Sequence, residues 1–118
     1  MSAATWVGVA LLGGVGAVLR HVVDAALVSP TASGLPLGIF VVNISGAFAL
    51  GLLAGSGVGD GTLLIMGTGL LGAFTTFSTW MLQTSVLLRD GRGPLAATYV
   101  TASVAIGFLA VAAGRGLA

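Results

Sequence analysis

Residues 62–88 read TLLIMGTGLLGAFTTFSTWMLQTSVLL, an apolar run with a cluster of hydroxyl side chains near its middle. A straight helix crosses a hydrocarbon core of about 30 Å with roughly 20 residues, so this run is longer than one straight crossing needs. Thr and Ser side chains can also hydrogen-bond to backbone carbonyls and bend a helix. The pattern predicts a membrane-spanning helix that can bend between Gly72 and Trp80, where a break would free carbonyl oxygens at mid-depth.

Three further apolar segments are long enough to cross a membrane. They are expected to run from about Thr5 to Leu27, from Leu37 to Ala54 and from Pro94 to Ala113. The links at 29–36, 55–61 and 89–93 are short and rich in glycine and proline, so consecutive helices should be antiparallel. None of the runs alternates as β-barrel strands do. The sequence therefore predicts an all-α membrane protein, a single domain of four transmembrane helices.

The composition supports a membrane location and excludes several functions. Of the 118 residues, 57% are hydrophobic and 6% are charged, whereas a typical soluble domain has about 25% charged residues. The chain lacks the clustered basic residues that nucleic-acid binding needs, and it lacks cysteine for a disulfide or a thiolate metal site. The first apolar run is too long for a secretory signal. We expect a multi-pass protein of the cell membrane.

Glycine is unusually frequent, at 20 of 118 residues, against an average near 7%. In lipid, small residues let helices approach closely and pack by dispersion. Ala47, Gly51 and Gly55 form one such stripe in the second span. We interpret the glycines mainly as packing positions.

The charges specify orientation only weakly. Four spans place both termini, Asp60 and Arg115 on one side of the membrane, and Arg89 and Arg92 on the other. This small arginine bias gives a weak preference for both termini outside. Such a chain is suited to insertion in both orientations, or to pairing with an oppositely oriented copy.

Two features inside the predicted spans need a reason, because polar groups are costly in lipid. Asn43 lies near the middle of the second span, where it is either a hydrogen-bonding link between helices, stabilising by about 1 kcal/mol, or part of a permeation path. Phe77 and Trp80 are three residues apart and share a helix face, either as packing or as pore lining. The residues alone leave these alternatives open.

Charged residues near the end of the first span suggest local structure rather than chemistry. Arg20 and Asp24 are four residues apart, so we expect an ion pair between them. His21 has no second His or Cys with which to share a metal. No set of nucleophile, base and orienting group can be recognised, so we do not expect an enzyme.

Three motifs occur in order along the chain: GGVGAVLR at 13–20, VNISG at 42–46 and GAFTTFST at 72–79. The second motif is preceded by Gly38 and the third by Gly69. In motif order, helix count and length, the whole chain resembles the Fluc (CrcB) family of fluoride channels. The hydroxyl-rich third motif is the most specific of the three.

The resemblance implies that the third helix is broken mid-membrane, and that the chain forms an antiparallel, dual-topology dimer with two pores near the subunit interface. It implies a passive, fluoride-selective channel that exports fluoride from the cytoplasm and reduces its toxicity. A structural sodium ion at the dimer centre would be held by backbone carbonyls of Gly72 and Thr75, and Arg20 would be structural. The implied pore residues are Asn43, Phe77, Trp80, Thr79, Tyr99 and Ser103.

Three positions depart from the family pattern. Trp80 stands where the family usually has Phe, Ile39 where it often has Thr, and Gly107 where a hydroxyl would continue the polar track of the fourth helix. These changes leave open a heterodimer with a paralogue, in which this chain is a non-conducting accessory subunit and transports fluoride poorly alone.

Two further alternatives have a different mechanism. A small multidrug-type, proton-coupled exporter also has four short spans, but it needs a carboxylate within the membrane. Asp24 is the residue that comes nearest to that requirement. A structural subunit without transport would explain the glycines, but it gives no reason for Asn43 or for the hydroxyl run 75–79.

Overall fold

The computed structural model describes residues 1–27 and 36–118, so the predicted link at 29–36 lies, except for Pro36, outside the described residues. Its elements are α1 (Ala3–Ala26), α2 (Leu37–Gly55), α3 (Asp60–Leu63), a π-helix η1 (Leu64–Leu71), α4 (Gly72–Phe74), α5 (Ser78–Arg89) and α6 (Gly93–Leu117). The segment Asp60–Arg89 forms one span with a break, and the described residues hold four helical spans long and apolar enough to cross a membrane. The chain is a multi-pass, all-helical membrane protein.

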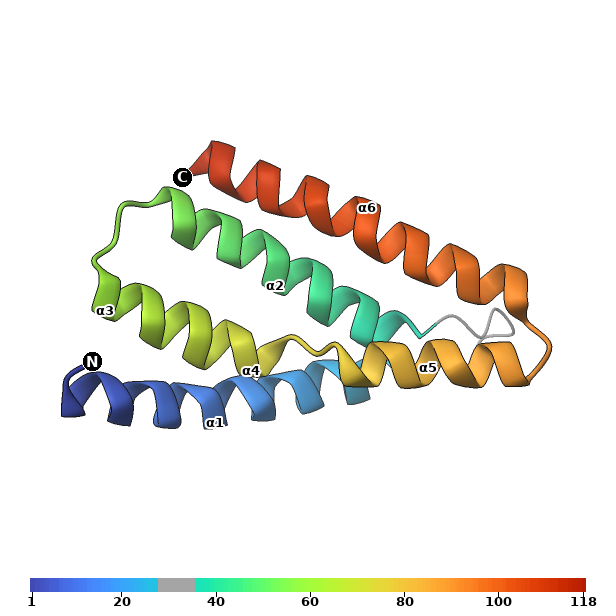
Figure 1. Ribbon diagram of the computed structural model, residues 1–118, viewed down its shortest axis with the longest axis horizontal. Coiled ribbons are helices and arrows are strands. Elements are labelled where there is room, and N and C mark those ends of the chain that lie inside the picture. Colours follow the sequence, from blue (N-terminus) through green and yellow to red (C-terminus); the bar gives the residue numbers. More distant parts are fainter. Residues whose placement is uncertain (28–35) are drawn as a thin grey trace.

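The spans lie side by side in an elongated bundle (Figure 1). Its extents are 49 × 28 × 21 Å, and the long dimension is close to the roughly 40–45 Å thickness of a bilayer with its headgroups. In Figure 1 the N- and C-termini lie at one end and the turn between α5 and α6 at the other. α6 packs mainly on α2, and α1 packs mainly along η1 and α4.

Glycines set the closest helix contacts, as expected from the composition. A β-carbon at Gly16 of α1 would overlap the carbonyl oxygen of Leu70 in η1. A β-carbon at Gly51 of α2 would likewise overlap the Val111 carbonyl oxygen in α6. Backbone therefore meets backbone at these positions, the arrangement that small residues permit between helices in lipid.

Two helices extend beyond the expected bounds. α1 begins at Ala3 rather than Thr5, because the Ser2 hydroxyl accepts a hydrogen bond from Thr5 N at 3.2 Å. α6 continues to Leu117 rather than ending at Ala113. The π-helix over Leu64–Leu71 was not predicted at all. Its residues show no side-chain pattern that distinguishes it from an apolar α-helix.

The expected ion pair between Arg20 and Asp24 is wrong. In the described part of the chain no such pair forms, and the Asp24 carboxylate lies instead against Gly38, in the first turn of α2. The N-terminus of α2 carries a partial positive charge, and its cap residue Pro36 makes no side-chain hydrogen bond. This helix end therefore competes with Arg20 for the carboxylate.

Gly16→Ala is expected to destabilise the bundle by about 1–3 kcal/mol, because the new methyl group overlaps backbone that cannot move aside alone. Unfolding of the purified protein in detergent, followed by circular dichroism, measures this change. Gly14→Ala is the matched control on the same helix, because a β-carbon at Gly14 meets nothing within 4 Å. Equal stability of the two variants would contradict the packing argument.

Candidate functional site

The third span is broken between α4 and α5, where the helical hydrogen bonds stop and restart. The last bond before the break runs from Thr75 N to Leu71 O at 2.9 Å, and the first after it from Met81 N to Phe77 O at 2.9 Å. Thr75 itself is extended, with φ −80° and ψ 160°. The break lies within the hydroxyl-rich segment where the sequence predicts it.

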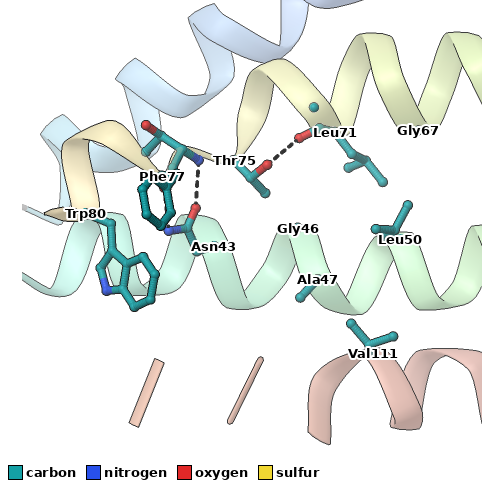
Figure 2. A pocket seen from close by; sticks show the side chains of 12 residues that line it. Asn43, Gly46, Ala47, Leu50, Gly67, Leu71, Thr75, Phe77, Trp80 and Val111 are labelled. Atoms are coloured by element: carbon teal, nitrogen blue, oxygen red, sulfur yellow. Dashed lines mark hydrogen bonds between the residues drawn. The ribbon is translucent and has the colours of Figure 1, made fainter. Parts of the chain in front are cut away.

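Asn43 of α2 forms two hydrogen bonds to the broken segment, a contact that we call the clasp (Figure 2). Its Nδ2 donates to the backbone carbonyl of Thr76 at 2.9 Å, and its Oδ1 accepts from the backbone N–H of Thr76 at 2.9 Å. The side-chain amide thus pairs with both polar groups of one residue's backbone. One hydrogen of Nδ2 is not used by this pairing, because the amide nitrogen carries two.

The Thr76 side chain caps the start of α5. Its Oγ1 accepts a hydrogen bond from Thr79 N at 3.3 Å and donates to Thr79 Oγ1 at 3.2 Å. A hydroxyl that accepts from an N–H three residues ahead is the usual way to satisfy the free N–H groups at a helix start. Thr79, one of the expected pore residues, is therefore bonded within the break.

Two backbone carbonyls lose their normal helical partners as a result. In a continuous α-helix, Gly72 O would accept from Thr76 N, and Thr75 O would accept from Thr79 N. Here Thr76 N donates to Asn43, and Thr79 N donates to the Thr76 hydroxyl. Gly72 and Thr75 are the two residues for which the family resemblance implies backbone ligation of a cation.

A hollow of about 380 Å³ lies between α2 and the broken span. Figure 2 shows Asn43, Phe77 and Trp80 together at one end of it. Phe77 and Trp80 meet edge to face, with ring centroids 5.8 Å apart and an angle of 75° between the rings. The Phe77 ring is 70% exposed. The lining also includes Thr75, Thr76, Gly72, Gly46 and Leu50, and it contains no charged residue.

A second hollow, of about 310 Å³, lies between α2 and α6. Asn43 lines it together with Ser103 and Gly107, so Asn43 borders both hollows. Among the described residues, two buried side-chain polar atoms have no hydrogen-bond partner, Trp80 Nε1 and Ser103 Oγ. Each of them belongs to a residue that lines one of the two hollows.

Other expected site residues lie apart from these hollows. Tyr99 is 1% exposed, packs with Leu87 and Ala96, and donates from its hydroxyl to Gln83 Oε1 at 2.8 Å. Arg20 is partly buried on α1 and lines neither hollow. Gln83 was not predicted from the sequence, although a lone amide in an apolar span is the same signal that singled out Asn43.

The fold and site define a class of protein, a small polytopic membrane protein whose third span is broken and clasped at mid-length by an asparagine. The sequence profile of the family described as CrcB-like protein, Camphor Resistance (CrcB), matches residues 7–115. The chain belongs to the CrcB family.

Relatives in this family match nearly the whole chain. A fluoride-specific ion channel, FluC 2, of Mycolicibacterium paratuberculosis is 47% identical over 115 residues, covering 98% of this chain and 94% of the relative. FluC 2 of Mycobacterium bovis is 42% identical over 118 residues, covering 100% and 94%. FluC of Deinococcus radiodurans, also named a fluoride-specific ion channel, is 43% identical over 120 residues, covering 98% and 95%.

Asn43→Asp is expected to destabilise the folded protein by about 1–3 kcal/mol at neutral pH, because a carboxylate cannot donate to the Thr76 carbonyl. Acidification should relieve part of this loss, since a protonated carboxyl regains a donor. Unfolding in detergent at neutral and acid pH measures both effects.

Ser45→Ala provides the control for that substitution, because the Ser45 hydroxyl bonds only within its own helix, to Val42 O at 3.1 Å. Its stability should be close to that of the wild type at both pH values. An Asn43→Asp variant as stable as Ser45→Ala would contradict the structural importance of the clasp.

Proposed function

We propose that the protein is a passive, fluoride-selective channel of the cell membrane that exports fluoride from the cytoplasm and reduces its toxicity. The observation that carries the proposal is a hollow beside the helix break that is lined by an amide, hydroxyls and aromatic rings, and by no charged residue. The relatives named as fluoride-specific channels, at 42–47% identity, narrow the anion to fluoride.

The chemistry of the hollow suits a small anion that has lost its water. A dehydrated anion needs hydrogen-bond donors in place of that water, and the unused Asn43 amide hydrogen is one. Aromatic rings are positive at their edges, so the exposed Phe77 ring can offer its edge to an anion. A carboxylate in the lining would repel the anion, and the lining has none.

The exposure of the break supports a dimer, which is part of this proposal. Phe77 and Ser78 are exposed in the single chain, although they lie next to irregular backbone. Such backbone is not tolerated against lipid unless protein or a water-filled cavity covers it. A second subunit in antiparallel orientation would provide the cover, and the weak charge bias permits this arrangement.

The partner subunit is either identical or a paralogue. Symbiobacterium thermophilum has two relatives, FluC 1 and FluC 2, each 43% identical to this chain. Two such chains in one organism support the paralogue alternative. The departures at Ile39, Trp80 and Gly107 are then the features that would distinguish an accessory subunit from a self-sufficient one.

The released carbonyls of Gly72 and Thr75 fit a hard cation, for which sodium is our proposal. Carbonyl oxygen is the ligand type such ions prefer, and the described residues hold no cluster of three or more His, Cys, Asp or Glu that would compete. Two carbonyls are too few ligands for a hard cation, so a symmetric partner that contributes the same two carbonyls would be needed. The ion would supply positive charge at the centre of the assembly.

The proton-coupled exporter is not favoured. It needs a titratable carboxylate on the transport path. Asp24, the residue closest to that role, lies against Gly38 at the start of α2 and lines neither hollow beside Asn43.

Fluoride efflux from liposomes that contain only this purified chain tests the function. Rapid fluoride release, with chloride release near that of empty liposomes, is the expected result. If liposomes with the folded chain alone release no fluoride but release it once a paralogue is added, the chain has the accessory role. No release under either condition would reject the proposed function.

Thr76→Val is expected to reduce fluoride efflux at least about tenfold and to weaken its dependence on sodium. Without the hydroxyl, Thr79 N is free to donate to Thr75 O and to close the helix over the cation ligand. Efflux is compared in sodium and in N-methylglucamine buffers. Thr76→Ser keeps the hydroxyl and should behave as wild type; equal loss in both variants would contradict this role.

A further inference from the structure

We propose that Asp24 is a positioning residue of the site, whose carboxylate seats the α2–α6 pair on the rest of the bundle at the depth that the clasp requires. The inference deepens the proposed function, on which its flux readout rests. It gives a role to a charged residue that lines neither hollow beside Asn43.

The four spans pack as two pairs. α6 packs mainly on α2, and α1 packs mainly along η1 and α4. Figure 1 shows α2 and α6 along one side of the bundle, and α1 with the third span along the other. The clasp joins one pair to the other, because Asn43 belongs to α2 and Thr76 to the third span, and the larger hollow lies between them. The way the pairs are seated on each other therefore determines the geometry of the site.

α2 begins without a side-chain cap of its own. Its cap residue Pro36 makes no side-chain hydrogen bond, and its first turn contains no acidic residue. The first helical hydrogen bond runs from Phe40 N to Pro36 O at 3.3 Å. The N–H groups of Leu37, Gly38 and Ile39 precede it, and Gly38 and Ile39 are buried away from water. The partial positive charge of this helix end therefore favours a negative group beside it.

The Asp24 carboxylate brings that negative group from the end of α1. It lies against Gly38, where a β-carbon would overlap Asp24 Oδ1 and would come 3.0 Å from the Asp24 Cα and carbonyl oxygen. A residue larger than glycine would force the two helices apart at this point. Asp24 is half-buried, and in the described part of the chain Arg20 does not pair with it. A carboxylate within a span is costly unless a positive group faces it, and the start of α2 is such a group.

The contact at Gly38 is coupled to the clasp through one helix. Gly38 and Asn43 are five residues apart on α2, a rise of about 7.5 Å. Between them, Ile39 and Val42 are buried, so packing holds this part of α2 rigid. Both hydrogen bonds of the clasp are 2.9 Å long, and hydrogen bonds weaken when donor and acceptor move apart or out of line. A displacement of α2 at Gly38 is therefore passed to Asn43 and loosens the clasp.

The chain offers a direct test, because Asn43 is its single asparagine. Selective ¹⁵N-asparagine labelling of the protein in nanodiscs gives one side-chain amide signal, in which the hydrogen that donates to the Thr76 carbonyl should resonate downfield of a free amide. Asp24→Ala is expected to remove most of this downfield shift. Asp90→Ala is the matched control and should leave it unchanged, because Asp90 is an exposed acid at the turn between α5 and α6.

A transplanted cap separates positioning from simple helix capping. In the double variant Asp24→Ala, Pro36→Asp, a carboxylate stands at the N-cap of α2 itself and can accept hydrogen bonds from the first turn. If Asp24 only stabilised the helix start, this variant would regain both the thermal stability and the amide signal of the wild type. We expect it to regain stability alone, because the new carboxylate makes no link to α1.

Fluoride efflux from liposomes should follow the amide signal rather than the stability. Asp24→Ala and the double variant should both release fluoride at least about fivefold more slowly than the wild type, the effect of losing one hydrogen bond of ordinary strength. Asp90→Ala should release it as the wild type does. Gly38→Ala reaches the same contact from the α2 side, and its overlap with Asp24 should loosen the clasp as well.

The outcomes separate this inference from the proposed function. An unchanged Asn43 signal in folded Asp24→Ala would overturn the inference and leave the function intact. Full recovery of the signal in the double variant would also overturn it, since capping alone would then suffice. Absence of efflux from the wild type rejects the function, whereas the amide signal still tests the inference. If Asp24→Ala does not fold, Asp24→Ser, which removes the charge but keeps a polar side chain, takes its place.

Discussion

The double hydrogen bond between the Asn43 amide and the Thr76 backbone is the interaction on which the site depends. A break in a membrane helix leaves peptide groups without partners, and in lipid there is no water to replace them. Asn43 supplies a donor and an acceptor to one such residue, at 2.9 Å each. Because Thr76 N donates to Asn43, it does not donate to the Gly72 carbonyl oxygen as it would in a continuous helix. The contact that satisfies the Thr76 backbone therefore also leaves the Gly72 carbonyl without its helical partner.

The sequence predicted the spans well because long apolar runs and glycine-rich links have a direct physical meaning in lipid. The hydroxyls grouped between Gly72 and Trp80 indicated where the third helix can bend, and the family resemblance implied that it is broken there. The ion pair between Arg20 and Asp24 failed because i,i+4 spacing takes no account of another helix. The start of α2 reaches Asp24 only once the chain has folded.

Within the site, residue types could be predicted but their partners could not. Asn43 was recognised as important, but its role as a hydrogen-bonding link between helices or as pore lining remained open. In the structure it forms hydrogen bonds to Thr76 and also borders both hollows. Tyr99 was expected along the pore and lies in the core, bonded to Gln83. Such pairings depend on side-chain directions between helices, which spacing along one helix does not determine.

The π-helix over Leu64–Leu71 changes how the rest of the third span is phased. Successive α-helical residues are about 100° apart around the axis, so each residue accommodated by widening a turn rotates everything after it by about that angle relative to a regular α-helix. The faces of α4 and of the hydroxyl segment therefore cannot be extrapolated from α3. If a single residue is removed from this wide segment, narrowing of the turn to a regular α-helix compensates for the loss, so the break keeps facing Asn43 and the hydrophobic length of the span is almost unaltered.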